Sequence, residues 1–128
     1  MEAAVQAVAS IVAPELSIVV PTYKESANVP ELVRRLAATL VGIDWEVIFV
    51  DDDSPDGTWR VAKEISLRDP RVRCIRRVGR RGLAGACIEG MLSSAAPTVA
   101  VMDADLQHDE ALLPKMLDAI RDGAELVV

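Results

Sequence analysis

Two short apolar runs in this sequence each end in a cluster of aspartates. The first run, residues 47–50, continues into the acidic stretch 51–53, and the second, residues 99–102, continues into Asp103 and Asp105. An apolar, β-branched run that is bounded by turn-forming residues predicts a buried strand. If both strands belong to one parallel sheet, their carboxyl ends lie at the same edge, where open α/β sheets bind ligands. We therefore expect the two acidic clusters to converge in one cleft.

The second cluster carries the oxygen donors that a hard divalent metal prefers. Side chains alternate along an extended chain, so Asp103 and Asp105 point to the same side, and the amide of Gln107 continues the alternation. Carboxylates at such close range repel one another unless they share a cation. Asp103, Asp105 and Gln107 are therefore predicted to bind Mg²⁺ or Mn²⁺ together with a phosphate-bearing ligand. The alternative is a solvated loop whose acids, Asp109 among them, cap the next helix.

Alternating strand and helix patterns indicate an α/β fold. Strands are expected at 16–20, 45–50, 72–75 and 98–102, and helices at 28–40, 58–68, 82–93 and 113–121. This alternation predicts a mostly parallel, Rossmann-like sheet with helices on both faces. We expect Pro21 to end the first strand, Asn28 and Glu31 to form a capping box, and Gly123 to close the last helix. Residues 125–128 begin a further strand, so the chain is expected to be a truncated piece of a larger domain.

Composition argues against several classes of protein. At 128 residues the chain is one domain at most, and its 51% of hydrophobic residues indicates a packed core. The net charge of −6 disfavours a nucleic-acid partner. Cys74 and Cys87 are expected to be reduced thiols. The start lacks the basic region of a signal peptide, and no apolar run approaches the ~20 residues that span a bilayer. We expect a cytoplasmic protein, at most peripheral to the cytoplasmic face of the membrane.

The loops after the first two predicted strands offer groups that suit a nucleotide. Asp52 could accept hydrogen bonds from ribose or base, Tyr23 could stack on the base, and Glu25 could accept from either. Each has a structural alternative. Asp56 and Thr58 suit a turn and the cap of the next helix, and Tyr23 suits packing within its loop.

Three other features have a purely structural explanation, which we favour. The arginines between 71 and 81 could face a diphosphate or an anionic membrane, but a solvated strand edge is more common. His108 suits a structural role at a helix start better than that of a general base. Gly85 and Gly90 lie inside a predicted helix, where they permit close approach to neighbouring segments.

Four segments occur in an order that resembles the family 2 glycosyltransferases with the GT-A fold. They are residues 21–25 (PTYKE), 50–58 (VDDDSPDGT), 82–86 (GLAGA) and 102–107 (MDADLQ). Within that family, the chain is most similar to the polyprenyl-phosphate glycosyltransferases typified by dolichyl-phosphate mannose synthase. The resemblance implies that residues 1–14 are an N-terminal extension and that residues 15–128 are the nucleotide-sugar-binding part of a GT-A domain.

The resemblance also implies roles for individual residues. The substrate pocket would be lined by Pro21, Tyr23, Glu25, Val50, Asp52, Asp103, Ala104 and Asp105. Asp105 and Gln107 would hold the metal. Asp105 is therefore the candidate catalytic residue.

The reaction implied by the resemblance is the inverting transfer of a hexose, with mannose favoured. The donor would be a nucleotide diphosphate sugar, with GDP-mannose favoured, and the acceptor a polyprenyl phosphate at a membrane surface. Mg²⁺ or Mn²⁺ would assist the departure of the diphosphate. A phosphate acceptor is already ionised near neutral pH, so no strong general base is required. A homo-oligomer is left open.

Three alternatives stay open. The chain could belong to a family 2 enzyme that uses a UDP-sugar and another acceptor, or it could bind a donor without transferring the sugar. A receiver domain, which is phosphorylated on an aspartate, also has a doubly wound fold with acidic strand ends. However, its paired acids follow the first strand, whereas here they follow the second. A stable aspartyl phosphate formed with a phosphodonor would favour the receiver.

Overall fold

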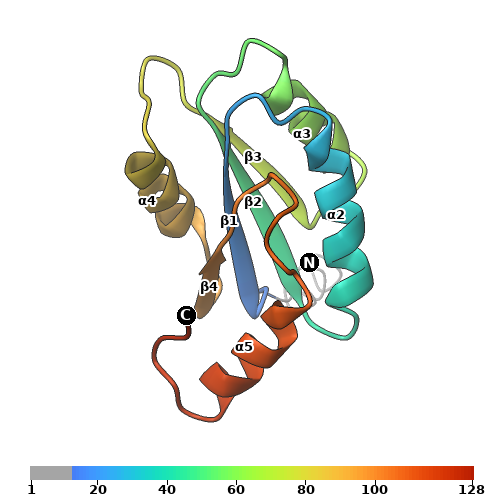
Figure 1. Ribbon diagram of the computed structural model, residues 1–128, viewed down its shortest axis with the longest axis vertical. Coiled ribbons are helices and arrows are strands. Elements are labelled where there is room, and N and C mark those ends of the chain that lie inside the picture. The colour runs from blue at the N-terminus through green and yellow to red at the C-terminus, as the bar shows by residue number, and fades with distance from the viewer. Residues whose placement is uncertain (1–12) are drawn as a thin grey trace, which may run out of the picture.

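The computed structural model describes residues 13–128, which form one four-stranded sheet with helices on both faces (Figure 1). The strands are β1 (Leu16–Thr22), β2 (Trp45–Asp51), β3 (Val72–Arg76) and β4 (Thr98–Val101). Their order in the sheet is β3-β2-β1-β4, and every neighbouring pair is parallel. The predicted parallel α/β fold is confirmed.

The helices follow the strands in strict alternation. They are α2 (Asn28–Thr39), α3 (Thr58–Ser66), α4 (Leu83–Ser93) and α5 (Leu112–Arg121). Figure 1 shows α2 and α3 on one face of the sheet and α4 alone on the other, with α5 beside β4. The element bounds agree with the sequence prediction to within one or two residues at each end.

The sheet separates two cores of unequal size. The larger lies under α2 and α3 and contains Ile18 and Phe49, neither of which is exposed. Because strand side chains alternate between faces, Val19 points to the other side, where it packs in a small cluster with α4. A Cβ atom on Gly90 would lie 2.4 Å from a Val19 methyl carbon. The expected close approach of α4 at Gly90 is therefore confirmed.

The prediction that Pro21 ends the first strand is wrong, because β1 continues to Thr22. The Thr22 carbonyl accepts a hydrogen bond from the N–H of Asp52, the residue that follows β2. Alternate residues of a parallel strand face alternate neighbours, so Pro21 faces the β4 side. Pairing between β1 and β4 stops at Val19 and Val101. The missing N–H of Pro21 therefore removes no ladder hydrogen bond.

The predicted capping box of α2 is not formed. The N-cap position is Ala27, which provides no side-chain cap. The backbone N–H groups of Asn28 and Val29 already donate to the Glu25 carbonyl. Glu31 pairs instead with arginines three and four residues further along the helix, so its carboxylate does not reach back to the helix start.

Two predictions concern the end of the chain. Gly123 follows α5 with a φ of +108°, as expected for a helix terminator. The predicted strand at 125–128 is absent from the structure, because these residues pair with no strand of the sheet.

The described residues also test two statements made from composition. Cys74 and Cys87 are free thiols, as expected, and burial raises the pKa of Cys74 to about 11. Among residues 13–128, no helix has the length and apolar character that crossing a bilayer requires.

Candidate functional site

Three loops leave the carboxyl edge of the sheet next to one another. Strand β1 lies between β2 and β4 and is parallel to both. The loops that follow residues 22, 51 and 101 therefore share one edge (Figure 1). Both acidic clusters lie at this edge, as the sequence predicts.

Each of these loops contains one residue in a strained backbone conformation. Lys24, Asp53 and Leu106 have φ values of +59°, +55° and +63°, and they are the only non-glycine residues with positive φ between 13 and 128. A side chain in this left-handed region costs of order 1 kcal/mol. Such strain persists where surrounding contacts enforce it, which is common at functional sites. The three loops are therefore the strongest candidates for a functional site.

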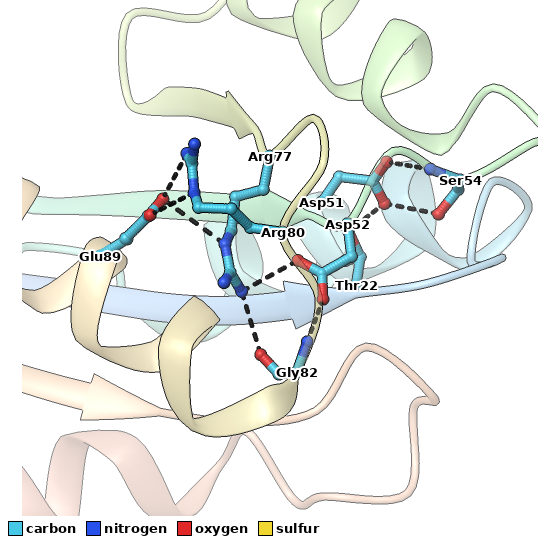
Figure 2. A network of polar contacts seen from close by, with 8 residues as sticks. All are labelled: Thr22, Asp51, Asp52, Ser54, Arg77, Arg80, Gly82 and Glu89. Carbon is cyan, nitrogen blue, oxygen red and sulfur yellow. Dashed lines mark hydrogen bonds and ion pairs between the residues drawn. The ribbon is translucent and has the colours of Figure 1, made fainter.

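Asp51 anchors the loop after β2 from inside the protein. Its side chain is fully buried. One carboxylate oxygen accepts hydrogen bonds from Thr22 Oγ1 and Ser54 Oγ, both at 2.7 Å, and the other accepts from the Ser54 N–H at 2.9 Å (Figure 2). Because all these donors belong to the protein, Asp51 shapes the loop and is not available to a ligand.

The loop after β1 is fastened to the loop after β2. The Lys24 N–H donates to Ser54 Oγ and the Glu25 N–H donates to Thr58 Oγ1, both at 2.9 Å. One oxygen of the Glu25 carboxylate accepts from the Asn28 amide at 2.7 Å. The position of Glu25 at the sheet edge is thus set by the loop after β2 and by the start of α3.

Asp56 has the structural role that the turn sequence allows. Its Oδ1 accepts from the Thr58 N–H at 3.0 Å and from Thr58 Oγ1 at 2.5 Å, and its Oδ2 accepts from the Ser26 N–H at 3.3 Å. Burial raises the pKa of Asp56, but these hydrogen bonds outweigh burial and bring the pKa below its usual range. Asp56 therefore supports the start of α3 and holds the neighbouring loop.

Of the other predicted pocket residues in β1 and β2, Tyr23 offers a side chain to a ligand. It is 40% exposed, and the Lys24 ammonium and the Arg81 guanidinium lie 5.4 and 5.2 Å from its ring centre. Val50 packs under α4 with no exposure, so its side chain is not available to a ligand. Pro21 is half-buried within β1.

Asp52 is held by two donors from the segment that leads into α4. Arg77 Nη1 donates to Oδ1 at 3.0 Å, and the Gly82 N–H donates to Oδ2 at 2.8 Å (Figure 2). Only 12% of the Asp52 side chain is exposed. Neither Arg77 nor Gly82 is among the predicted site residues. The spacing of the arginine run does not reveal which arginine folds inward.

The other paired arginines of that run fit a solvated strand edge. Their carboxylate partners lie 2.7 to 2.9 Å away, in the pairs Arg71–Asp69, Arg73–Glu46, Arg76–Asp53 and Arg80–Glu89. Arg76 also stacks on Trp59, with 3.9 Å between the guanidinium carbon and the ring centre. Arg77 is the exception, since only 4% of the residue is exposed.

The loop after β4 is open to solvent. Asp103, Asp105 and Gln107 are all exposed, whereas Ala104 is buried in the larger core. Asp105 Oδ1 accepts from the Gln107 N–H at 3.1 Å. The Asp103 N–H donates to His108 Nδ1 at 3.3 Å, and the Asp103 carboxylate lies 3.5 Å from His108 Nε2. His108 thus has the structural role favoured above.

The oxygen atoms that the loop after β4 offers are of the kind that binds a divalent cation. Asp103, Asp105 and Gln107 provide only oxygen atoms, and their side chains are exposed. Among residues 13–128, no three His, Cys, Asp or Glu side chains gather into a metal site. An ion held here would therefore complete its coordination with water or with ligand phosphates, as Mg²⁺ commonly does. The assignment of these three ligands stays a prediction.

Neither of the two best-defined hollows in the described residues joins the two acidic loops. One lies at the opposite end of the sheet and includes Ile43 and Trp45 in its lining. The other lies beside the turn after β2 and is lined in part by Asp53, Trp59 and Arg76. The predicted cleft between the acidic loops therefore stays a prediction, although the shared edge is observed.

The sequence matches the family described as "Glycosyl transferase family 2" over residues 17–128. This chain belongs to glycosyltransferase family 2. It is 41% identical, over 114 residues, to a dolichol-phosphate mannosyltransferase of Pyrococcus furiosus, and the match covers 89% of this chain and 32% of that protein. It is 35% identical, over 113 residues, to a dolichol-phosphate mannosyltransferase of Saccharomyces cerevisiae, with 86% and 42% covered. The predicted family is confirmed.

A solved mannosyltransferase structure has the same fold. The mannosyltransferase of Pyrobaculum calidifontis, in complex with GDP-Man and Mn²⁺, matches with a TM-score of 0.70 and 24% identity, covering 88% of this chain and 34% of that one. The GT-A prediction is confirmed by this match. The family 2 chain described here spans 32% and 42% of the lengths of the two mannosyltransferase sequences above.

Proposed function

We propose that this chain is the donor-binding part of a metal-dependent, inverting mannosyltransferase. The enzyme transfers mannose from GDP-mannose to a polyprenyl phosphate of the dolichyl type, at the cytoplasmic face of a membrane. One observation carries the proposal. The family's two acidic loops leave the same sheet edge on either side of β1, in a chain that is 41% identical to a protein named dolichol-phosphate mannosyltransferase.

The loops after β1 and β2 bind the nucleoside. Asp52 accepts a hydrogen bond from ribose or base, because each of its oxygens receives one protein donor and a carboxylate has about four acceptor sites. Glu25 keeps one carboxylate oxygen that does not accept from Asn28. Tyr23 is exposed and offers its ring for stacking on the base.

The loop after β4 binds the diphosphate end of the donor. Asp103, Asp105 and Gln107 would hold the cation, and Mg²⁺ or Mn²⁺ held there would supply positive charge to the departing diphosphate. Ala104 is buried in the larger core, and the acids on either side of it project outward.

The acceptor needs orientation more than deprotonation. A polyprenyl phosphate is already ionised near neutral pH, so the described residues have to position the donor for attack at the anomeric carbon. The sequence offers one histidine, His108, and it contacts Asp103.

Calorimetry with GDP and UDP, each with and without Mn²⁺, tests donor binding. GDP is expected to bind in the presence of Mn²⁺ and to bind at least about tenfold more weakly without it. Tighter binding of UDP would favour the UDP-sugar alternative. Absence of binding to either nucleotide would refute the proposal.

Transfer is tested separately, with GDP-mannose and a short polyprenyl phosphate as substrates. The 128-residue chain is expected to bind the donor and to form little product by itself. Rapid turnover by this chain alone would show that the described residues also bind the acceptor. Formation of a stable aspartyl phosphate with acetyl phosphate would support the receiver alternative instead.

A further inference from the structure

Arg77 is buried at the point where the predicted nucleotide-binding segment meets α4. Arginine is rarely buried to this extent without partners, and here 4% of the residue is exposed. Its backbone N–H donates to the Asp51 carbonyl at 2.8 Å. Its Nη1 donates to Asp52 Oδ1 and to the Gly82 carbonyl, both at 3.0 Å (Figure 2). One side chain thus connects the end of β2 to the start of α4.

The Arg77 guanidinium is only partly paired on the side that faces Glu89. Its Nε lies 3.6 Å from Glu89 Oε2 and has no hydrogen-bond partner among the described residues. Glu89 is closer to Arg80, at 2.9 Å. A buried cation is costly when it lacks a partner. Asp52 is therefore the main anion that holds Arg77 in place, and Arg77 equally restrains Asp52.

We infer that Arg77 is a positioning residue of the donor site, an inference that rests on the proposed function. It fixes the Asp52 carboxylate in one orientation and leaves one acceptor site on each oxygen for the nucleoside. Through Gly82 and Glu89 it also links that orientation to the placement of α4. Preorganised acceptors bind more tightly than mobile ones because less freedom is lost on binding.

Gly85 makes room for the Arg77 guanidinium. A Cβ atom at position 85 would lie 2.7 Å from Arg77 Nη2. Arg77 could avoid that clash only by moving its guanidinium, which would disturb the hydrogen bond to Asp52. Alanine is also a better helix former than glycine, which favours α4 itself. Gly85→Ala therefore tests the orientation of the Arg77 side chain without weakening helix α4 itself.

The experiment measures GDP affinity by calorimetry in Mn²⁺, together with the urea midpoint, for the wild-type chain and three variants. Arg77→Gln and Gly85→Ala are each expected to weaken GDP binding about tenfold. Gly85→Ala keeps both charged groups and is expected to stay folded, with a urea midpoint closer to the wild-type value than that of Arg77→Gln. The matched control is Arg73→Gln, because Arg73 also joins β3 to α4, through the Ser93 carbonyl at the far end of the helix. It should keep GDP affinity within about twofold.

Unchanged GDP affinity in Gly85→Ala, or in folded Arg77→Gln, would overturn the inference and leave the proposed function intact. The same would follow if Arg73→Gln weakened GDP binding as much as Arg77→Gln, because the loss would then reflect general loosening of α4. Failure of the wild-type chain to bind GDP would instead overturn the proposed function, and this inference with it.

Discussion

The two acidic loops leave the same edge of the sheet but are built in opposite ways. In the loop after β2, Asp51 and Asp56 accept hydrogen bonds from the end of β1 and the start of α3, and Asp52 accepts from Arg77 and Gly82. In the loop after β4, the acids are exposed and their contacts stay within the loop, in the pairs Asp103–His108 and Asp105–Gln107.

This difference assigns different physical tasks to the two loops. The first balances its charge with donors of the protein, so its oxygens are already oriented before a ligand arrives. The second projects its negative charge into solvent, where an external cation can compensate it. Directional recognition of a nucleoside suits the first arrangement, and metal binding suits the second.

The largest contrast is expected in stability. Asp51→Asn should lower the free energy of unfolding by about 3 kcal/mol, because the buried site would lose the charge of the carboxylate that accepts from Thr22 and Ser54. Asp103→Asn, the matched change in the second loop, should alter it by no more than about 0.5 kcal/mol. Urea denaturation of both variants measures the difference. Equal losses would show that the two loops are equally integrated in the fold.

The reverse contrast is expected in metal-dependent binding. Asp105→Asn should weaken GDP binding in Mn²⁺ at least about tenfold, because the neutral amide is a poorer ligand for a hard cation. The control is Asp109→Asn, which removes the same charge from the same loop but alters a carboxylate that accepts from the Ala111 N–H. It should change the affinity no more than about twofold. Calorimetry that finds Asp105→Asn equal to wild type would remove Asp105 from the metal site.

The positions of the two acidic loops can be predicted from the sequence, because they depend on local residue patterns. Apolar runs with turn residues predict the strands, and strict alternation with helices predicts parallel pairing, which places both acidic loops at one edge. Asp56 and Gly123 act as their local sequence predicts. Such features depend on neighbours within a few residues, so one sequence is enough to predict them.

The side-chain partners could not be predicted in the same way. Asp52 and Arg77 are 25 residues apart, and the parallel pairing of β2 with β3, in which Asp51 lies opposite Arg76, brings them together. Asp51 and Asp52 are adjacent aspartates, yet the side chain of Asp51 is fully buried, whereas part of the Asp52 side chain is exposed. Glu31 has two possible sets of partners, and the arginines outcompete the predicted cap. For the aspartates tertiary contacts decide, whereas for Glu31 the choice is between two sets of partners within a few residues of it.

A smaller difference between the two loops is expected in the rate of amide hydrogen exchange. Without ligand, amides in 103–109 should exchange at least about tenfold faster than those in 51–57, because the second loop has few contacts outside itself. GDP with Mn²⁺ should slow exchange in both loops, and more strongly in the second. Mass spectrometry of peptides from each loop provides the measurement. Equal protection before ligand addition would contradict the proposed difference in rigidity.

The smallest expected effect is the pH dependence of the first loop. Hydrogen bonds from Thr58 and Ser26 lower the pKa of Asp56 in the folded protein, despite the opposing effect of burial. The unfolded chain therefore binds a proton more readily, so this stabilisation is present above the ordinary pKa of 3.8 and is lost as pH falls through the lower, folded-state value. Urea midpoints of wild type and Asp56→Asn should differ at neutral pH and converge in acid. A difference in urea midpoint that does not change with pH would mean that the negative charge of Asp56 does not stabilise the turn. The rigidity of the first loop would then have to come from Asp51 and its buried partners alone.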